Sequence, residues 1–438
     1  MQSTSKLVWL LLPLTVLGCQ RPQQTNATGP GNSASSGNAR HDWLLPSSPG
    51  ASEPDLVATP DGRLLLSWID NVPGRRNALQ FAAWGSDGHW QSAPRTIVVG
   101  DSLLTDAANT PHIATTTDGA LWVHWLQKTG GAGEAADVML SRSADGGFKW
   151  SPPARVNTVV GSGASGFAAL WPASRSSIGI AWLQGQSMPS QSMPPQNMSP
   201  QHVSPAPTPS PARVDTATVL HATVFDADLR RSAGSDIDAM VCDCCQSDVA
   251  MTTRGALLVY RDRTPEEIRD IAATRFDGMH WSAPKPVHVD GWKMPACPVN
   301  GPAVAANGND VVVAWYTAAG DTPTVQLARS ADAGDTFAAP VVLEHGTEVQ
   351  GRVAVALDAQ QVWVLWVRED ASGQSLWLAR YASDLSRQLQ RVQVAKLQGR
   401  GRATGFPQLA LRADGAYIVW TDVIDGAPQL RGARFGRQ

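Results

Sequence analysis

The chain has 438 residues, with 35 Lys and Arg against 38 Asp and Glu and a formal net charge of -3. A charge so close to zero gives no electrostatic attraction for nucleic acid or for an anionic membrane surface, so neither is expected as a partner. The 17 Trp, 39 Gly and 31 Pro, with few long amphipathic windows, predict an all-β protein with frequent turns.

The first 19 residues have the features of an export signal. Lys6 precedes an apolar run over residues 7–17, and Val16-Leu17-Gly18-Cys19 resembles a bacterial lipobox, in which the Cys becomes the lipidated N-terminus. The resemblance implies a lipid-anchored protein of the cell envelope, at the outer membrane or in the periplasm. An ordinary secretory signal that is cut near Gly18 is the alternative. No other apolar run approaches the length of a membrane span, so the lipid would be the only anchor.

Residues 20–50 are rich in Ser, Gly, Asn and Gln. Such a composition cannot bury a hydrophobic core, because it offers little apolar surface to offset the loss of chain entropy. We therefore predict a flexible tether between the export signal and the folded domain.

A short apolar strand that ends in an aromatic residue recurs seven times in the rest of the chain. The aromatic residues are Trp68, Trp125, Trp182, Tyr260, Trp315, Trp366 and Trp420. Six of these units also show the other strands of a four-stranded antiparallel blade, and the seventh stops after its third strand. We predict an all-β β-propeller over residues 51–438 with seven blades, closed by a strand from Asp42-Trp43-Leu44-Leu45-Pro46. Six blades, with one unit taken as partial, is the alternative.

Two turns share the pattern Ser-x-Asp-x-Gly followed by an aromatic residue. They are residues 143–150 and 330–337, with weaker copies at residues 86–90 and 276–281. In such a turn the Asp carboxylate can accept backbone N–H bonds, the Gly supplies a positive φ, and the aromatic residue is expected to pack into the next blade. The pattern resembles the Asp-box, or bacterial neuraminidase repeat, of sialidases. That resemblance implies a sialidase-like propeller with these turns on the face opposite its ligand site.

One step between the repeats is longer than the others and contains an insertion. Residues 184–213 carry Met188, Met193, Met198 and His202 among Gln, Ser and Pro. Thioether and imidazole ligands suit Cu(I), and the segment resembles the Met-rich stretches of bacterial copper-handling proteins. A polar low-complexity loop is the alternative interpretation.

Propeller topology places two kinds of loop on one face: those that lead into the first strand of a blade, and those that join its second and third strands. Cys242-Asp243-Cys244-Cys245 and residues 294–301 lead into the fourth and fifth blades, and residues 261–270 join two strands of the fourth. Arg352 and Arg402 lead into the sixth and seventh. We therefore predict one ligand site on a rim that carries both cysteines and arginines.

Apart from Cys19, the chain has four cysteines: Cys242, Cys244, Cys245 and Cys297. An even number in an oxidising compartment favours two disulfides, with three possible pairings. Every pairing joins two of the three clustered cysteines to each other and bonds Cys297 to the third. A thiolate site for copper or zinc is the second interpretation, and redox chemistry is the third.

The charged loop at residues 261–270 has a structural interpretation as well. Thr264-Pro265-Glu266-Glu267 fits a capping box with Pro at the first helical position, which predicts one helical turn. The neighbouring arginines and aspartates could form a lattice of ion pairs. His124 lies within an apolar strand and is expected to be a packed or hydrogen-bonded residue.

The sialidase resemblance also implies a set of active-site residues. Arg261, Arg352 and Arg402 would clamp the carboxylate of an acidic sugar, as the arginine triad of a sialidase does. Tyr316 would be the nucleophile with Glu348 as its helper, and Asp262 or Asp106 would be the acid. The family's early Arg-Ile-Pro motif is absent and no Tyr follows Arg402 in a rim loop, so the resemblance covers the propeller and not the full active site.

Three functions remain open from the sequence. The first is a carbohydrate-active protein, an exo-glycosidase of sialidase type or a glycan-binding protein, which acts on an acidic glycan or another small ligand and requires no cofactor. The second is a copper-binding or thiol-dependent envelope protein that uses the four cysteines and the Met-rich segment. The third is a recognition propeller without catalysis.

Overall fold

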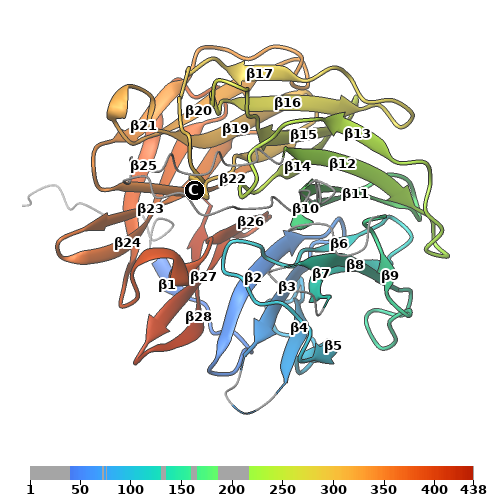
Figure 1. Cartoon of the computed structure of the whole chain (residues 1–438). Helices are drawn as coiled ribbons and strands as arrows, with labels where there is room; N and C mark the ends of the chain where they lie inside the picture. Colours follow the sequence, from blue (N-terminus) through green and yellow to red (C-terminus); the bar gives the residue numbers. More distant parts are fainter. Residues whose placement is uncertain are drawn as a thin grey trace, which may run out of the picture. The chain divides into compact units, whose positions relative to one another are not determined.

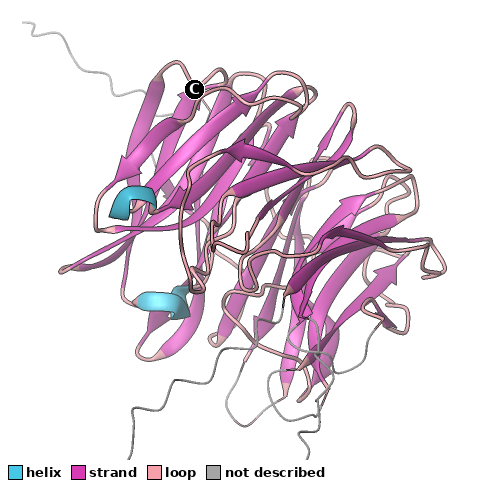
Figure 2. Ribbon diagram, turned by 45° about the horizontal axis from the view of Figure 1, so that its top comes forward, coloured by secondary structure: helices cyan, strands magenta, loops and turns pink. Residues whose placement is uncertain are grey.

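The computed structural model describes residues 40–71, 74, 76–129, 135–158, 165–185 and 217–437, all of which belong to the compact unit from Gly37 to Gln438. The predicted export signal, the lipidation site Cys19, residues 20–39 and nearly all of the Met-rich insertion lie outside these residues. Seven four-stranded antiparallel sheets make up the described chain, with only two short 3-10 turns, η2 (Ala319–Asp321) and η3 (Gly401–Thr404) (Figure 2). No described helix could cross a membrane.

Each of the first three blades takes four consecutive strands from the chain. Blade 1 has β2 (Ala51–Ala58), β3 (Leu64–Asp70), β4 (Asn77–Trp84) and β5 (Arg95–Gly100). Blade 2 has β6 (Ile113–Thr115), β7 (Leu121–Lys128), β8 (Ala136–Ser143) and β9 (Ala154–Arg155). Blade 3 has β10 (Ser165–Pro172), β11 (Ile178–Gly185), β12 (Thr218–Phe225) and β13 (Ser235–Asp238).

The remaining blades continue the pattern around the ring (Figure 1). Blade 4 has β14 (Asp248–Thr252), β15 (Gly255–Arg261), β16 (Ile271–Phe276) and β17 (Lys285–His288). Blade 5 has β18 (Ala303–Asn307), β19 (Asp310–Thr317), β20 (Thr324–Ser330) and β21 (Val341–His345). Blade 6 has β22 (Val349–Leu357), β23 (Gln361–Asp370), β24 (Gly373–Ala382) and β25 (Gln388–Leu397). Blade 7 has β26 (Gln408–Arg412), β27 (Gly415–Ile424) and β28 (Ala427–Gly436), completed by β1 (Arg40–Asp42).

The N-terminal strand closes the ring, as predicted. β1 pairs antiparallel with β28 (Figure 1), and in the register of this pair Arg40 lies opposite Phe435. The closing strand ends at Asp42, earlier than predicted, and the buried Trp43 follows it and donates its backbone N–H to the carbonyl of Gly432. The seven-bladed prediction is confirmed, and the propeller begins at Arg40, within the stretch predicted as a tether.

The hydrophobic core lies between neighbouring blades. The second strand of a blade is covered on both of its faces. The sequence of such a strand is a continuous run of apolar residues and not an alternation of apolar and polar ones. β19 shows this pattern in Val311-Val312-Val313-Ala314-Trp315, which is fully buried, with alternate residues in different clusters. The aromatic residues that mark the repeat are therefore core residues of the second strands, and each strand continues one to four residues beyond its aromatic residue instead of ending there as predicted.

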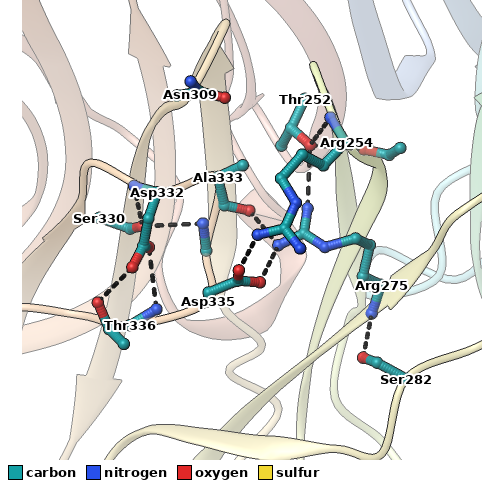
Figure 3. A network of polar contacts seen from close by, with 12 residues as sticks. Thr252, Arg254, Arg275, Ser282, Asn309, Ser330, Asp332, Ala333, Asp335 and Thr336 are labelled. Atoms are coloured by element: carbon teal, nitrogen blue, oxygen red, sulfur yellow. Dashed lines mark hydrogen bonds and ion pairs between the residues drawn. The ribbon is translucent and has the colours of Figure 1, made fainter.

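The two best Ser-x-Asp-x-Gly turns join the third and fourth strands of their blades and have the predicted hydrogen bonds. Asp145 accepts the backbone N–H groups of Phe148 and Lys149 at 3.0 and 2.9 Å. In the second turn, Asp332 accepts the hydroxyls of Ser330 and Thr336 (Figure 3), and these bonds lower the pKa of the Asp332 carboxyl to about 2.

An arginine of one blade also binds the turn between the third and fourth strands of the next blade. Arg275 donates to the carbonyl of Ala333 and forms an ion pair with Asp335, which Arg254 also approaches (Figure 3). Arg95 of blade 1 donates to the carbonyl of Gly146 in the same way, at 2.7 Å. These contacts connect consecutive blades around the ring.

The aromatic residues of the turns pack onto the preceding blade. The prediction that they pack into the next blade is wrong. Trp150 of blade 2 meets Phe81 of β4 edge-on at 5.9 Å, and Trp281 of blade 4 meets Trp171 of β10 at 5.6 Å. The turn follows the third strand, and its aromatic side chain points back across the sheet face that the earlier blade covers. Gly147 sits at φ 86° in this contact, and a Cβ there would lie 2.1 Å from the Phe81 ring.

Candidate functional site

The rim that carries the cysteines is held together by Asn300, the residue before Gly301 in the loop that leads into β18. Its carbonyl accepts Nε of Arg261 at 2.9 Å, and its side-chain oxygen accepts the backbone N–H of Arg352 at 2.8 Å. The carbonyl of Tyr316 accepts Nη2 of Arg261 at 2.6 Å. Residues of blades 4, 5 and 6 therefore meet at one end of the propeller.

Arg261 does not present an open carboxylate clamp, which differs from the prediction. Its side chain is 1% exposed, and its third guanidinium nitrogen donates to the carbonyl of Arg269 at 2.7 Å. The group also lies over the ring of Trp292. Burial lowers the pKa of Arg261 to about 10. Because all three nitrogens bind backbone carbonyls, a ligand carboxylate would have to displace part of the rim to reach them.

Arg352 is likewise bound within the protein, and Arg402 is the exposed member of the predicted triad. Arg352 donates to the Thr404 hydroxyl at 2.8 Å and to the carbonyls of Gly405 and Gly401. Burial lowers the pKa of Arg352 to about 10, and the nearby charge of Arg402 acts in the same direction. Arg402 itself lies in η3 with its side chain in solvent.

The predicted nucleophile and its helper are not joined by a hydrogen bond in the described part of the chain. Tyr316 is half-buried and packs edge-on against Trp292 at 5.6 Å, and burial raises the pKa of its phenol. Glu348 lies in the loop before β22, and its carboxylate comes close to Gly346 of the same loop. The geometry therefore does not show the activated tyrosine that the sialidase resemblance implies.

Asp262, the predicted acid, directly follows β15 of blade 4 and lies beside Asp238, the last residue of β13 in blade 3. Burial raises the pKa of Asp262 to about 6, and the negative charge of Asp238 contributes to the shift. Asp238 accepts the hydroxyl of Tyr260 at 2.7 Å. Asp262 could therefore hold a proton in weakly acidic solution.

The four cysteines form two disulfides, Cys242–Cys245 and Cys244–Cys297. The pairing joins two close neighbours and fastens the loop before β14 to the loop before β18. Cysteine binds metal ions through its thiolate, so the sulfurs offer no metal ligands while both bonds are intact.

The charged loop before β16 forms ion pairs and not the predicted helical turn. Glu267 sits at φ 66°, outside the right-handed helical region, and the backbone N–H of Thr264 donates to the carbonyl of Ile268. Arg269 pairs with Glu267 at 3.0 Å and with Asp243 at 3.3 Å. Ion pairs therefore form around Glu267, from Arg263 and Arg269. Two expected members lie outside them: Arg261 binds carbonyls, and Asp270 accepts the backbone N–H groups of Gly291 and Trp292.

A cavity of about 430 Å³ runs along the axis of the propeller, and the sequence analysis missed its chemistry. Its wall contains residues from the first strands of all seven blades and from the loops before them. Asp55, His112 and Asp248 contribute titratable groups, and Phe167 and Phe406 contribute aromatic rings. Both phenylalanines are half-buried, so part of each ring is open to the cavity.

The titratable groups of the cavity are arranged as a His–Asp pair and a second Asp. Nδ1 of His112 lies 3.0 Å from Asp55, whose other carboxylate oxygen accepts the backbone N–H of Ile113. Burial opposes protonation of His112, but the Asp55 carboxylate outweighs it and raises the pKa of the imidazole. Burial also raises the pKa of Asp248 to about 6, although Val304 and Val249 donate backbone N–H groups to it.

His124 stands behind this pair and is packed, as expected. It is fully buried, its ring centroid lies 5.3 Å from that of His112, and burial lowers its pKa well below the ordinary value. A neutral His124 cannot repel a protonated His112, so its role towards the His112–Asp55 pair is packing.

The three channel residues occupy equivalent positions in their blades. Asp55 lies opposite Ser67 and Asp248 opposite Val259 in the strand pairing, and the backbone N–H of His124 donates to the carbonyl of His112. Each of these partners comes just before the aromatic residue of its repeat. An alignment of the first strands would have shown polar residues at this one position.

Glu53 and Asp106 lie at the boundary of blades 1 and 2, each two residues before a residue that lines the channel, Asp55 or Ala108. Glu53 is 6% exposed, and its Oε2 has no hydrogen-bond partner among the described residues. Burial raises the pKa of Glu53 to about 8, although it accepts the backbone N–H of Asp106. Asp106, a predicted acid, uses its carboxylate to accept the N–H of Ala108 at 3.0 Å.

Comparison with known proteins shows similarity of fold only. No known protein-family profile matches the chain, and no curated protein matches its sequence. Among solved structures, the polysaccharide lyase Uly1 is similar over 88% of this chain and 90% of its own, with 6% identity and a TM-score of 0.51. A protein of unknown function from Dyadobacter fermentans matches 89% of this chain and 95% of its own at 14% identity and a TM-score of 0.47. The sialidase of Trypanosoma rangeli, in complex with 2,3-difluorosialic acid, matches 88% and 59% at 12% identity and a TM-score of 0.43.

Proposed function

We propose that the protein is a glycan-active propeller that binds an acidic saccharide at the mouth of its central channel. The observation that carries the proposal is the axial cavity, in which a His–Asp pair, a second Asp and two aromatic rings share one wall. Saccharides present hydroxyls to polar groups and C–H faces to aromatic rings, and this cavity offers both. Its volume of about 430 Å³ lies within the range of small-ligand sites.

The charge of the ligand is inferred from Arg402. Arg261 and Arg352 are bound by backbone carbonyls, whereas Arg402 is exposed in the loop that continues into Phe406. A guanidinium can bind a planar carboxylate or a sulfate with two hydrogen bonds. The proposal thus retains one arginine of the predicted triad.

The chemistry within the channel would be general acid–base catalysis. Asp55 orients His112, which can accept or donate a proton, and Asp248 stays protonated up to a pH of about 6. Cleavage of a glycosidic bond needs such a donor and acceptor. In this proposal these residues take the roles that the sequence analysis gave to Asp262, Tyr316 and Glu348.

The binding experiment compares Arg402→Ala with Arg431→Ala, because Arg431 is also exposed but lies on the outer part of blade 7. Oligosaccharides that carry uronate, sulfate or sialic acid are tested by isothermal titration calorimetry. Loss of the Arg402 ion pair should weaken binding roughly 10- to 100-fold. Arg431→Ala should bind as the wild type does; equal binding by both variants would remove Arg402 from the site.

Catalysis is tested separately with His112→Gln. General acid–base catalysis contributes about 10²- to 10⁴-fold, so product formation, followed by mass spectrometry, should fall by that order while binding persists. Turnover that is unchanged in this variant contradicts the catalytic role. Binding without turnover in the wild type would leave a recognition protein with the same ligand.

The lipid anchor at Cys19 and the location in the cell envelope belong to the same proposal. They rest on the resemblance of residues 16–19 to a lipobox. Metabolic labelling with a fatty acid should mark the wild type and not Cys19→Ser. An unlabelled wild type that is secreted in soluble form would support the ordinary signal peptide instead.

A further inference from the structure

The four sulfur atoms of the rim lie in one compact group. The Sγ atoms of Cys242, Cys244 and Cys245 all lie within 4.8 Å of one another, and Cys297 is bonded to Cys244. Cys242 and Cys245 are buried, whereas Cys244 and Cys297 are half-buried. A molecule in solution can therefore reach the group through the Cys244–Cys297 pair.

Backbone contacts other than the disulfides hold the two loops in place. Cys242 donates its backbone N–H to the carbonyl of Arg261, and the side chain of Gln246, directly after Cys245, binds the backbone N–H of Gly301 at 3.0 Å. On the side of Cys297, the backbone N–H of Met294 donates to the carbonyl of Glu267. The sulfurs should therefore stay close together after the S–S bonds are reduced.

A buried cation stands beside the sulfurs. Arg269 is 3% exposed, and its Nη1 lies 3.3 Å from Sγ of Cys242. In the oxidised protein the sulfurs carry no charge, and Glu267 and Asp243 already pair with the guanidinium. If the cysteines are thiolates, Arg269 offsets part of their negative charge.

From this geometry we propose that reduction converts the disulfide pair into a binding site for one thiophilic d¹⁰ cation, Cu(I) or Zn(II). Thiolates are the preferred ligands of both ions, and four of them give a Zn(II) complex a net charge of minus two and a Cu(I) complex minus three. The contact with Arg269 favours such an anionic complex. This inference concerns the rim of blades 4 and 5 and does not depend on the proposed saccharide site.

The conversion needs a reductant, which we take to be a dithiol. A dithiol thiolate attacks one sulfur of the half-buried Cys244–Cys297 bond, and the other sulfur leaves as a thiolate. The second thiol of the reductant then closes its own disulfide and releases the bound cysteine. A second dithiol reduces Cys242–Cys245 by the same two displacements. In total two dithiols are oxidised and four cysteine thiols form, and these thiols release their protons to solution as the cation binds.

The test uses the full chain in two redox states. Protein that has been reduced under anaerobic conditions and freed of reductant is titrated with Cu(I) or Zn(II) against a chromophoric chelator, beside the oxidised protein. The reduced form should take up about one equivalent more than the oxidised form at the same chelator concentration, with thiolate charge-transfer absorption in the Cu(I) case, because only the cysteines differ between the two forms. Equal uptake by the two forms, or no uptake by the reduced form, overturns the proposal.

Variants identify the ligands. Cys297→Ser should weaken binding by the reduced protein, and Arg269→Gln should weaken it roughly 10- to 100-fold by removing the neighbouring charge. Cys19→Ser, which removes the fifth cysteine, should bind as the wild type does. Circular dichroism of the reduced forms checks that they remain folded, and uptake that is unchanged in Cys297→Ser but lost in Cys19→Ser would place the cation elsewhere.

Discussion

At the scale of single residues, Glu53 shows how burial changes the behaviour of a carboxyl group. The unfolded carboxyl ionises near its ordinary pKa of 4.5, whereas the folded one has a pKa of about 8. Between these pH values the unfolded chain has released a proton that the folded chain still binds. The free energy of unfolding therefore falls as the pH rises through this range.

We therefore expect Glu53→Gln to flatten the dependence of stability on pH. The wild type should lose on the order of 2–4 kcal/mol of unfolding free energy between pH 5 and pH 9 through this one group, because each unit of pKa shift corresponds to about 1.4 kcal/mol. Over the same pH range, the unfolding free energy of the variant should fall by about 2–4 kcal/mol less than that of the wild type. Urea unfolding, followed by tryptophan fluorescence, measures both proteins. Parallel curves for the two proteins across that range would show that Glu53 ionises normally.

Single residues are also where sequence analysis reached its limit. The pattern correctly placed His124 in the core, because a polar residue in an otherwise apolar strand has few other places to lie. It could not show that Arg261 and Arg352 bind carbonyls, since a buried arginine and a ligand-binding arginine look alike in sequence. Asp55 and His112 stand in separate repeats, and only the packing of two neighbouring blades brings them into contact.

At the scale of elements, the two disulfides differ in the length of chain that they close. Cys244 and Cys297 are 53 residues apart, whereas Cys242 and Cys245 are 3 apart. A cross-link restricts the unfolded chain more when its loop is longer. The Cys244–Cys297 bond should therefore supply most of the stabilisation, and it joins the loops that lead into two successive blades.

Replacement of Cys244 and Cys297 together by Ala should lower the unfolding free energy by about 4 kcal/mol under oxidising conditions, by the entropy of loop closure. The matched control is the double replacement of Cys242 and Cys245, which removes the same number of sulfur atoms and should cost about 2 kcal/mol by the same estimate. Calorimetric unfolding of the two double variants makes the comparison. An equal loss in both would mean that local packing, and not loop length, sets the contribution.

The elements themselves were the most predictable part of the chain. The second strands are buried on both faces and contain a large aromatic residue, so β3, β7, β11, β15, β19, β23 and β27 could all be located from sequence. The short outer strands, such as β9 (Ala154–Arg155), carry little pattern of their own. The direction in which Trp150 packs was missed because a turn motif does not specify which neighbouring sheet its aromatic residue meets.

At the scale of the whole molecule, ring closure depends on a short N-terminal segment. β1 has three residues, and the adjacent Trp43 packs between the last and first blades, against Tyr417 at 4.9 Å and Trp90 at 5.2 Å. Most of the apolar surface that this segment buries belongs to Trp43. The side chain of Leu44, directly after it, is 83% exposed.

Trp43→Ala should therefore cost about 3–5 kcal/mol of unfolding free energy, the usual loss for a large buried aromatic residue. Leu44→Ala is the neighbouring control and should change it by less than about 0.5 kcal/mol. Thermal unfolding of the three proteins measures the difference. If the two variants unfold together, the closing segment does not hold the ring.

The same closure places both ends of the folded chain on one sheet, with Arg40 opposite Phe435. A linker of a few residues could join them, and new termini could be opened in a turn between two other blades without any break in the ring. A mechanical pull on the chain ahead of Arg40 would first load the three residue pairs of β1 and β28. If the N-terminus is anchored, force on the chain would therefore begin to unfold the propeller at blade 7.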